Sequence, residues 1–190
     1  LKRLIAFSSI SHMGFVLLGI SSVGTLTDKL TTAGLSGAAL QLFTHGTITG
    51  LLFLCVGVIY QRTHTRYIPD LGGLASRMPL LSTIFMIAGL AALGLPSTSG
   101  FVSEILIFMG AFPAAKWATI ISVSGVVLAA GYILWMTQRT LFGPSPSHYG
   151  NIRDVSLSEL FAMLLLLIPI IGVGLYPKLL TTVSIQVSFL

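Results

Sequence analysis

The chain has 190 residues, of which 54% are apolar and only 8% are charged, and its formal net charge is +5. A soluble globular domain carries about 25% charged residues, so this composition excludes an ordinary soluble enzyme, and its high apolar content excludes a disordered chain. The ten Lys and Arg residues are scattered rather than gathered in a stripe, which excludes a nucleic-acid-binding surface.

Five long stretches of the sequence carry almost no charge, and each can hold a membrane-spanning helix of about 20 mostly apolar residues. In chain order, the predicted spans are residues 4–24, 37–60, 79–112, 117–141 and 158–176. Barrel strands are excluded because they alternate apolar and polar residues, which runs such as MLLLLIPIIGVGL do not. The predicted fold class is therefore an all-α polytopic membrane bundle of five helices, forming a single membrane domain over residues 1–190.

Basic residues are distributed unequally between the two sides of such a bundle. If five helices alternate in direction, the first side receives Lys2, Arg3, Arg62, Arg66, Arg77, Arg139 and Arg153, and the second receives Lys29, Lys116 and Lys178. The excess of Lys and Arg predicts that the N-terminal end faces a cytoplasm-like compartment. Because a span follows Leu1 almost directly, without the features of a signal peptide, we expect the C-terminal part of a longer membrane protein.

The third span is too long for one simple helix, and the segment GLPSTSG at residues 94–100 predicts a break in it. Pro96 cannot donate a backbone hydrogen bond, and Gly94 and Gly100 flank it. A carboxylate, Glu104, follows one turn after this break, near the N-terminus of the second half-helix, which favours an ion or proton site. The alternative is that the span ends at residue 95 and that Glu104 lies in an interfacial loop.

Two histidines lie inside predicted spans. His12 is in the first span, with Ser8 one turn before it, and His45 is in the second span, between Gln41 and Thr49 on one helical face. A neutral imidazole accepts a proton on one nitrogen and donates from the other, which suits a proton relay. The alternative is hydrogen bonding that holds helices together. Two histidines and a carboxylate on three adjacent spans favour a hydrated polar axis.

Four other residues have simpler interpretations. Cys55 is the only cysteine, so a disulfide framework and a multi-cysteine metal site are excluded, and its apolar surroundings predict a small buried side chain. His64 and His148 fall in loops. Lys116, next to a tryptophan, is interpreted as an interfacial anchor, the alternative being a role inside the bundle. No dinucleotide, phosphate-loop or haem motif is present, so we expect no cofactor in this chain.

The loop before the last span, GPSPSHYGNIRDVSLSE, has the Pro, Ser and Gly content of an irregular segment. Ser156 or Ser158 is expected to cap the last helix, because serine side chains accept hydrogen bonds from free amides at helix starts. Glu159 would then lie in the first turn, where a negative charge is favourable.

Five motifs in this order resemble the antiporter-like subunit M family of respiratory complex I, which is called chain 4 in the mitochondrial enzyme and has cyanobacterial and plastid relatives. They are KRLIAFSSISHMGF (2–15), LFTHGTITGLLFL (42–54), YQRTHTRYIPDLGGLASRMP (60–79), GLPSTSGFVSEILIFMGAF (94–112) and QRTLFG (138–143). The resemblance implies a parent chain of fourteen helices, of which these would be helices ten to fourteen. It also implies a fold shared with Mrp-type cation/proton antiporter subunits and with the membrane subunits of hydrogenase and formate-lyase complexes.

The same resemblance implies a function, proton translocation coupled to electron transfer from NADH to quinone. Glu104 would be the terminal carboxylate of the proton path on a broken twelfth helix, where related subunits generally have Lys, and His12 and His45 would belong to the central hydrophilic axis. NADH, FMN, iron–sulfur clusters and quinone would bind other subunits. The partners implied are other complex I membrane subunits, including neighbouring antiporter-like ones, and the lipid bilayer.

The location implied is a bacterial plasma membrane, with the thylakoid or the mitochondrial inner membrane as alternatives. The main functional alternative is a cation/proton antiporter subunit of the Mrp type, which needs no redox partner. A membrane subunit of a hydrogenase or formate-lyase complex and a purely structural membrane chain are the other two.

Overall fold

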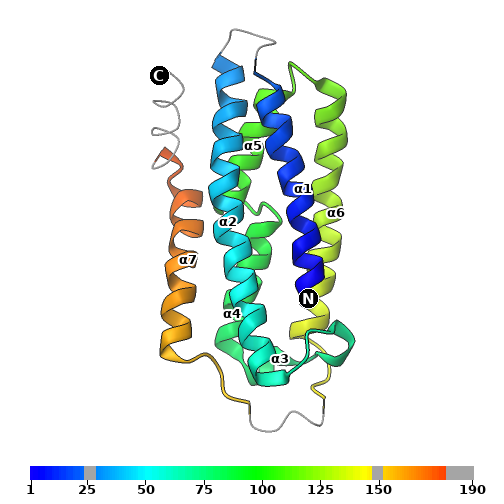
Figure 1. The fold of residues 1–190 in the computed structure, drawn as a ribbon, viewed down its shortest axis with the longest axis vertical. Coiled ribbons are helices and arrows are strands. Elements are labelled where there is room, and N and C mark those ends of the chain that lie inside the picture. Colours follow the sequence, from blue (N-terminus) through cyan, green and yellow to red (C-terminus); the bar gives the residue numbers. More distant parts are fainter. Residues whose placement is uncertain (24–28, 147–151, 179–190) are drawn as a thin grey trace.

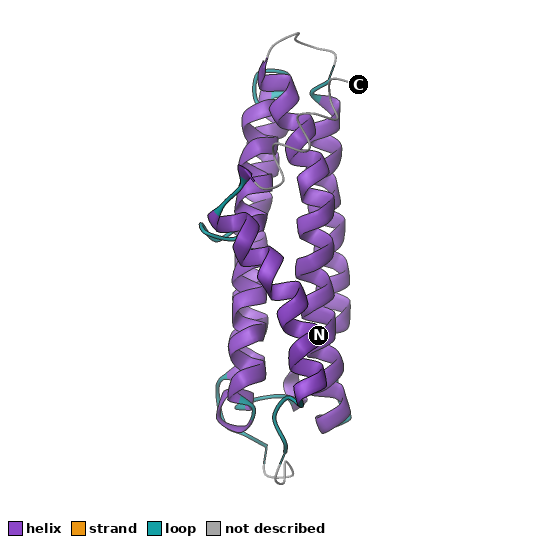
Figure 2. Ribbon diagram, turned by 90° about the vertical axis from the view of Figure 1, so that its left-hand side faces the viewer, coloured by secondary structure: helices purple, strands orange, loops and turns teal. Residues whose placement is uncertain are grey.

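The computed structural model describes residues 1–23, 29–146 and 152–178, and all regular structure in these ranges is helical (Figure 1). The elements are α1 (Lys2–Ser21), α2 (Lys29–Thr63), a 3-10 turn (Ile68–Asp70), α3 (Leu74–Arg77), α4 (Pro79–Ala92), α5 (Ser99–Ala111), α6 (Lys116–Leu141) and α7 (Leu157–Leu175). Figures 1 and 2 show the long helices running side by side along the long axis of the molecule. This is the all-helical bundle that the sequence predicts.

Four helices in the described part of the chain are long and apolar enough to cross a membrane: α1, residues 32–63 of α2, α6 and α7. By contrast α4, with 14 residues, and α5, with 13, are shorter. At 1.5 Å per residue each would reach only about 20 Å, short of the hydrocarbon core of about 30 Å. In Figure 1 α5 lies above α4, so the two together have the length of one span. The bundle therefore has the predicted five spans only if α4 and α5 are counted as the two halves of one broken span.

The second helix begins earlier than the sequence predicts. The expected span is residues 37–60, whereas α2 covers Lys29–Thr63. The prediction of its start was wrong because hydropathy marks the part of a helix that suits the membrane interior, and the more polar segment KLTTAGLS continues the same helix. The other three unbroken spans agree with their helices to within three residues at each end.

Helix α2 is the central element of the bundle, and glycines bring α1 and α5 close to it. A Cβ atom added to Gly19 of α1 would lie 2.7 Å from the carbonyl oxygen of Gly34 in α2. A Cβ added to Gly37 of α2 would lie 2.7 Å from the backbone nitrogen of Ile107 in α5. Small residues at helix interfaces allow backbones to approach closely in membranes. These two contacts fix where the polar side chains of α1, α2 and α5 meet.

The apolar core extends from α2 to α4, α6 and α7. Cys55 of α2 is fully buried in it, together with Phe85 of α4, Met136 of α6 and Met163 of α7. The outer faces of α6 and α7 instead expose large apolar side chains, among them Trp117, Ile121, Leu128, Phe161, Leu165 and Ile168. A surface of this kind suits lipid or another membrane protein and not water.

Two carboxylates organise the helix starts at the lower end of the molecule in Figure 1. Ser156 caps α7 in a capping box, in which its hydroxyl accepts from the Glu159 amide and the Glu159 side chain accepts from the Ser156 amide. The Asp154 side chain accepts hydrogen bonds from the Leu80 and Leu81 amides at 2.8 and 3.2 Å, and so caps α4 from a distant segment. Of the two serines considered from sequence, Ser156 is therefore the cap.

Candidate functional site

The third span is interrupted at residues 93–98, where α4 ends and α5 has not begun. The Leu95 amide donates to the Leu90 carbonyl and the Gly94 amide to the Ala91 carbonyl, both at 3.1 Å, with Gly94 at φ +68°. These two bonds and the left-handed glycine form a Schellman motif, a common C-terminal cap. Gly94 therefore ends the helix, and Pro96, which the sequence pattern indicated as the cause of the break, follows after the chain has already turned.

The second half of the interruption packs against two helices. Gly100 lies in the first turn of α5 rather than in the break, and a Cβ added to it would lie 2.5 Å from the Ala91 carbonyl oxygen of α4. On the other side, the Ser97 carbonyl contacts Gly174 of α7 closely, and Ser97 itself has φ +78°. Irregular backbone at membrane depth needs protein or water around it, and here α4 and α7 supply part of that cover.

Glu104 lies in the second turn of α5 and is buried, with only 5% of its surface exposed. Side chains on a helix lean toward its N-terminus, so the carboxylate reaches back toward the break. Its Oε1 atom lies 3.3 Å from Nδ1 of His12, and its Oε2 atom lies against Gly94, where an added Cβ would come within 2.6 Å. Because the dipole effect fades after the first turn of a helix, the close polar contact of Glu104 with His12 is more relevant to this site than the half-helix N-terminus.

His12 is the centre of the polar contacts between α1, α2 and α5. It is 4% exposed, and its Nδ1 atom lies 3.4 Å from Nε2 of Gln41 as well as near Glu104. The ring of His45, which is half-buried, has its centroid 5.1 Å from that of His12. The structure thus brings together all three residues that the sequence predicted for the polar axis: His12, His45 and Glu104.

The Nε2 atom of His12 is buried and has no hydrogen-bond partner among the described residues. Buried polar atoms are almost always paired with protein or ordered water, so an orphan of this kind requires an explanation. A histidine that exchanges protons with a transient partner on this nitrogen is one such explanation, and an internal water that completes the pairing is another. Both explanations place water or a proton donor next to His12.

Sequence reasoning missed two residues of this site. The Ser103 hydroxyl donates to Oε1 of Gln41, and the Thr44 hydroxyl lies 3.2 Å from that of Ser103. We call the whole set the polar cluster; it comprises His12, Gln41, Thr44, His45, Ser103 and Glu104. Thr44 could have been found, because it lies three residues after Gln41 and shares its face. Nothing in the sequence singled out Ser103 beyond its position next to Glu104.

Several polar residues singled out from the sequence lie outside this cluster or satisfy their own helix. The Ser8 hydroxyl donates to the Ile5 carbonyl, and the Thr49 hydroxyl donates to the His45 carbonyl. Lys116 is exposed at the start of α6, with its Nζ atom 6.0 Å from the centre of the Phe112 ring, which fits an anchor at the membrane boundary. His64 is exposed, and His148 lies outside the described residues.

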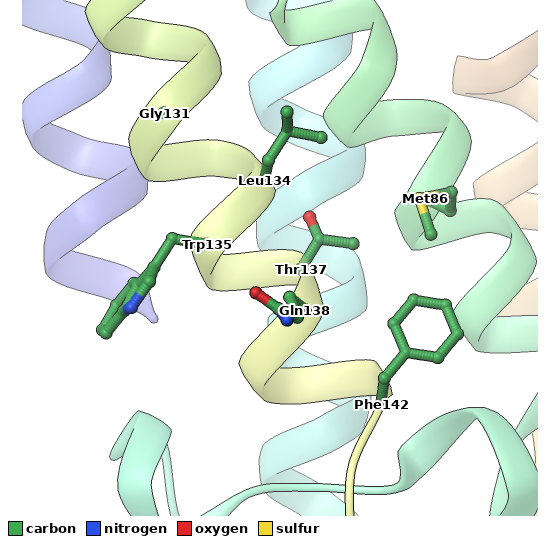
Figure 3. Close-up of a pocket in the computed structure, with 7 residues that line it drawn as sticks. All are labelled: Met86, Gly131, Leu134, Trp135, Thr137, Gln138 and Phe142. Atoms are coloured by element: carbon green, nitrogen blue, oxygen red, sulfur yellow. The ribbon is translucent and has the colours of Figure 1, made fainter.

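A pocket of about 470 Å³ lies between α4 and α6 (Figure 3). Its lining residues are Met86, Gly131, Leu134, Trp135, Thr137, Gln138 and Phe142. None of them belongs to the polar cluster, and Figure 3 shows mostly apolar and aromatic side chains there. Within the described ranges, no three His, Cys, Asp or Glu side chains are grouped so that they could hold a metal ion.

Two curated proteins illustrate the sequence similarity of this chain. NADH-quinone oxidoreductase subunit M of Rhodobacter capsulatus is 44% identical over 184 residues, which are 95% of this chain and 34% of that protein. NAD(P)H-quinone oxidoreductase chain 4 2 of Synechococcus sp. (strain JA-3-3Ab) is 42% identical over 196 residues, which are 98% of this chain and 35% of that protein. The chain therefore spans about a third of the length of these relatives.

Two solved structures illustrate the similarity of the fold. A chain of respiratory complex I from Thermus thermophilus with bound NADH matches with a TM-score of 0.85 and 32% identity, over 95% of this chain and 36% of that chain. A chain of the Mrp complex from Dietzia sp. DQ12-45-1b matches with a TM-score of 0.81 over 95% of this chain and 40% of that chain. Its identity is only 22%, so this second likeness concerns the fold alone.

The family model described as NADH:quinone oxidoreductase/Mrp antiporter, TM, matches residues 1–129. The matched region contains α1, α2, α4 and α5 and therefore the whole polar cluster. In the ranges that the structure describes, four helices are long and apolar enough to cross a membrane, which agrees with a multi-pass membrane protein. The chain belongs to the NADH:quinone oxidoreductase/Mrp antiporter transmembrane family.

Proposed function

We propose that this chain is part of a proton-translocating subunit of an NADH:quinone oxidoreductase, of the subunit M type. The observation that supports this best is the contact between two buried ionisable side chains at the helix break, His12 Nδ1 and Glu104 Oε1, 3.3 Å apart. Ionisable groups within membrane spans are costly and usually mark ion or proton paths. The names of its curated relatives favour the same function.

The proposed step is proton exchange between His12 and Glu104. When both ring nitrogens of His12 are protonated, Nδ1 can donate to the Glu104 carboxylate; when that proton moves to Oε1, His12 becomes neutral with its remaining proton on Nε2, and Glu104 becomes a neutral acid. Gln41 Nε2, 3.4 Å from Nδ1, can donate to this nitrogen only in the second state. His12 therefore has a suitable partner on either side of the transfer, so neither state leaves Nδ1 unpaired.

In this proposal the driving force comes from redox chemistry in other subunits of the complex. Burial favours the neutral acid and an approaching positive charge favours the carboxylate, so a charge that moves in a neighbouring segment would load and unload Glu104. NADH oxidation and quinone reduction, with FMN and iron–sulfur clusters, are assigned to other subunits. The proposed partners are the other membrane subunits, including neighbouring antiporter-like ones, in a bacterial plasma membrane.

A cation/proton antiporter subunit of the Mrp type is the second candidate, because the family description covers both kinds of protein. The lower identity to the Mrp structure, 22% against 32% for the complex I chain, favours the first candidate. By the resemblance, Glu104 in place of the Lys of related subunits also favours subunit M. The two candidates differ in one property: only the first requires NADH oxidation to move protons.

The test is the pair of substitutions Glu104→Gln and Glu104→Asp in the full-length protein within its complex. Glutamine keeps the shape but cannot ionise, so we expect it to abolish most NADH-driven proton uptake by inverted membrane vesicles, whereas aspartate should retain a substantial part. Complex content and NADH oxidation by the same membranes are the controls. Full proton uptake with glutamine would remove Glu104 from the path, and uptake driven by a sodium gradient without NADH would favour the antiporter.

A further inference from the structure

Gly94 closes the turn after α4 and also lies against the side chain of Glu104. The Oε2 atom of Glu104 lies where a side chain at position 94 would begin: an added Cβ would be 2.6 Å from Oε2 and 3.4 Å from the carboxyl carbon. Ordinary van der Waals contact starts at 3.4 Å, so no side chain fits at position 94 while Glu104 keeps its place. Glu104 is therefore held between His12 on one side and a glycine backbone on the other.

The turn alone also favours glycine at this position, because Gly94 has φ +68° and closes the Schellman motif of α4. The two requirements can be separated. Asparagine adopts the left-handed conformation more readily than other residues with a side chain, so it suits the turn, but it carries the Cβ atom that would meet Glu104. If only the turn requires glycine at position 94, asparagine should be tolerated there. If the Glu104 carboxylate requires glycine, asparagine should not be tolerated.

We propose that Gly94 is a positioning residue for proton transfer: its lack of a side chain reserves the space for the Glu104 carboxylate, so that an acid of the length of glutamate reaches His12. The inference rests on the proposed function of Glu104. A Cβ at position 94 would displace the carboxylate, and the contact with His12, already 3.3 Å long, would open. A shorter acid at position 104 would leave room for that Cβ atom.

The test uses four forms of the full-length protein in its complex, combining Gly94 or Gly94→Ala with Glu104 or Glu104→Asp. With Gly94 present, glutamate should support faster NADH-driven proton uptake than aspartate. With Gly94→Ala, the glutamate form should fall by about tenfold or more, since small misplacements of reacting groups have large effects on rate. Adding Glu104→Asp should then restore part of the activity, so the preference between the two acids reverses.

Gly143→Ala is the matched control. Gly143 also has a positive φ, +95°, but within the described part of the chain nothing lies within 4 Å of a Cβ added there, so its substitution strains the backbone without touching Glu104. We expect it to leave proton uptake per assembled complex near normal. Gly94→Asn should behave like Gly94→Ala, although asparagine relieves the turn.

The outcomes separate this inference from the proposed function. An unchanged preference for glutamate over aspartate in Gly94→Ala, or full activity of Gly94→Asn, would overturn the inference and leave Gly94 serving the turn alone. The inference would also be overturned if the Gly94 variants failed to assemble with glutamate and with aspartate at position 104. If Gly94→Ala assembled only when combined with Glu104→Asp, that result would support the inference. Glu104→Gln decides the proposed function independently, whatever the result at Gly94.

Discussion

Arg62, at the end of α2, donates through one guanidinium nitrogen to both carboxylate oxygens of Glu159 in the first turn of α7, at 3.0 and 2.9 Å. The same carboxylate accepts from the Ser156 amide in the capping box. One side chain thus completes the start of α7 and links that helix to α2, the central helix of the bundle. Different substitutions of Glu159 can remove the ion pair with Arg62 alone or the ion pair together with the cap of α7.

We expect Glu159→Gln to have a small effect and Glu159→Ala a larger one. Glutamine also serves at the third position of a capping box, so Glu159→Gln loses only a partly exposed ion pair, about 0.5 kcal/mol. Alanine loses the cap as well, about 1–2 kcal/mol in all. Hydrogen exchange of the amides at residues 156–160 in the purified full-length protein should rise in that order.

The ion pair has its own control. Arg62→Gln should raise exchange at the start of α7 about as much as Glu159→Gln, and the double variant should add little to either, because both remove the same contact. High salt should reduce the difference between wild type and Glu159→Gln. A Glu159→Gln effect as large as that of alanine would contradict the separation of cap and ion pair.

A second prediction concerns Gln41, which is only 2% exposed and contacts both His12 and Ser103. We expect Gln41→Leu to lower NADH-driven proton uptake about tenfold, because neutral His12 then has no donor to Nδ1 once the Glu104 proton has moved on, and leaving a buried polar group unpaired costs about 1–3 kcal/mol. Thr44→Val is the matched control from the same helix, since Thr44 contacts Ser103 and not His12. Equal losses in the two variants would show that the hydrogen bonds serve only packing.

Much of the fold could be predicted because its signals are local. Long uncharged stretches mark α1, α6 and α7 to within a few residues, and the capping of α7 follows from serine and glutamate three positions apart. The break in the third span also has a local signal in glycine and proline. Its cause was assigned to Pro96, since the sequence shows a missing donor but not the left-handed turn at Gly94 that ends α4 first.

The contacts of the site could not be predicted in the same way. Which residues of α1, α2 and α5 meet depends on how the helices are aligned, and this alignment is set by backbone contacts at Gly19, Gly34 and Gly37. A stripe of polar residues on α2 indicates which face of that helix is buried, but it does not indicate which residues of other helices contact that face. The sequence therefore predicts that His12 and Glu104 face the bundle interior, but their direct contact, and the hydroxyl of Ser103 beside them, come only from the packing.

The last prediction concerns that alignment at Gly37, one turn before Gln41 on α2. A Cβ at position 37 would lie 2.7 Å from the Ile107 nitrogen and 2.8 Å from the Cβ of Leu106, so Gly37→Ala must push α2 and α5 apart. Overpacking of this kind costs about 1–3 kcal/mol, and here it should also weaken the bond between Ser103 and Gln41.

We therefore expect Gly37→Ala to lower both the content of assembled complex and the proton uptake of the complex that remains. Gly57→Ala is the matched control on the same helix, since none of the described residues lies within 4 Å of its added Cβ and alanine is the better helix former. Complex content in membranes and proton uptake per complex are measured for both variants. Normal uptake by Gly37→Ala would show that the polar cluster tolerates a change in the spacing of α2 and α5, and that the close contact at Gly37 stabilises the bundle without positioning Gln41.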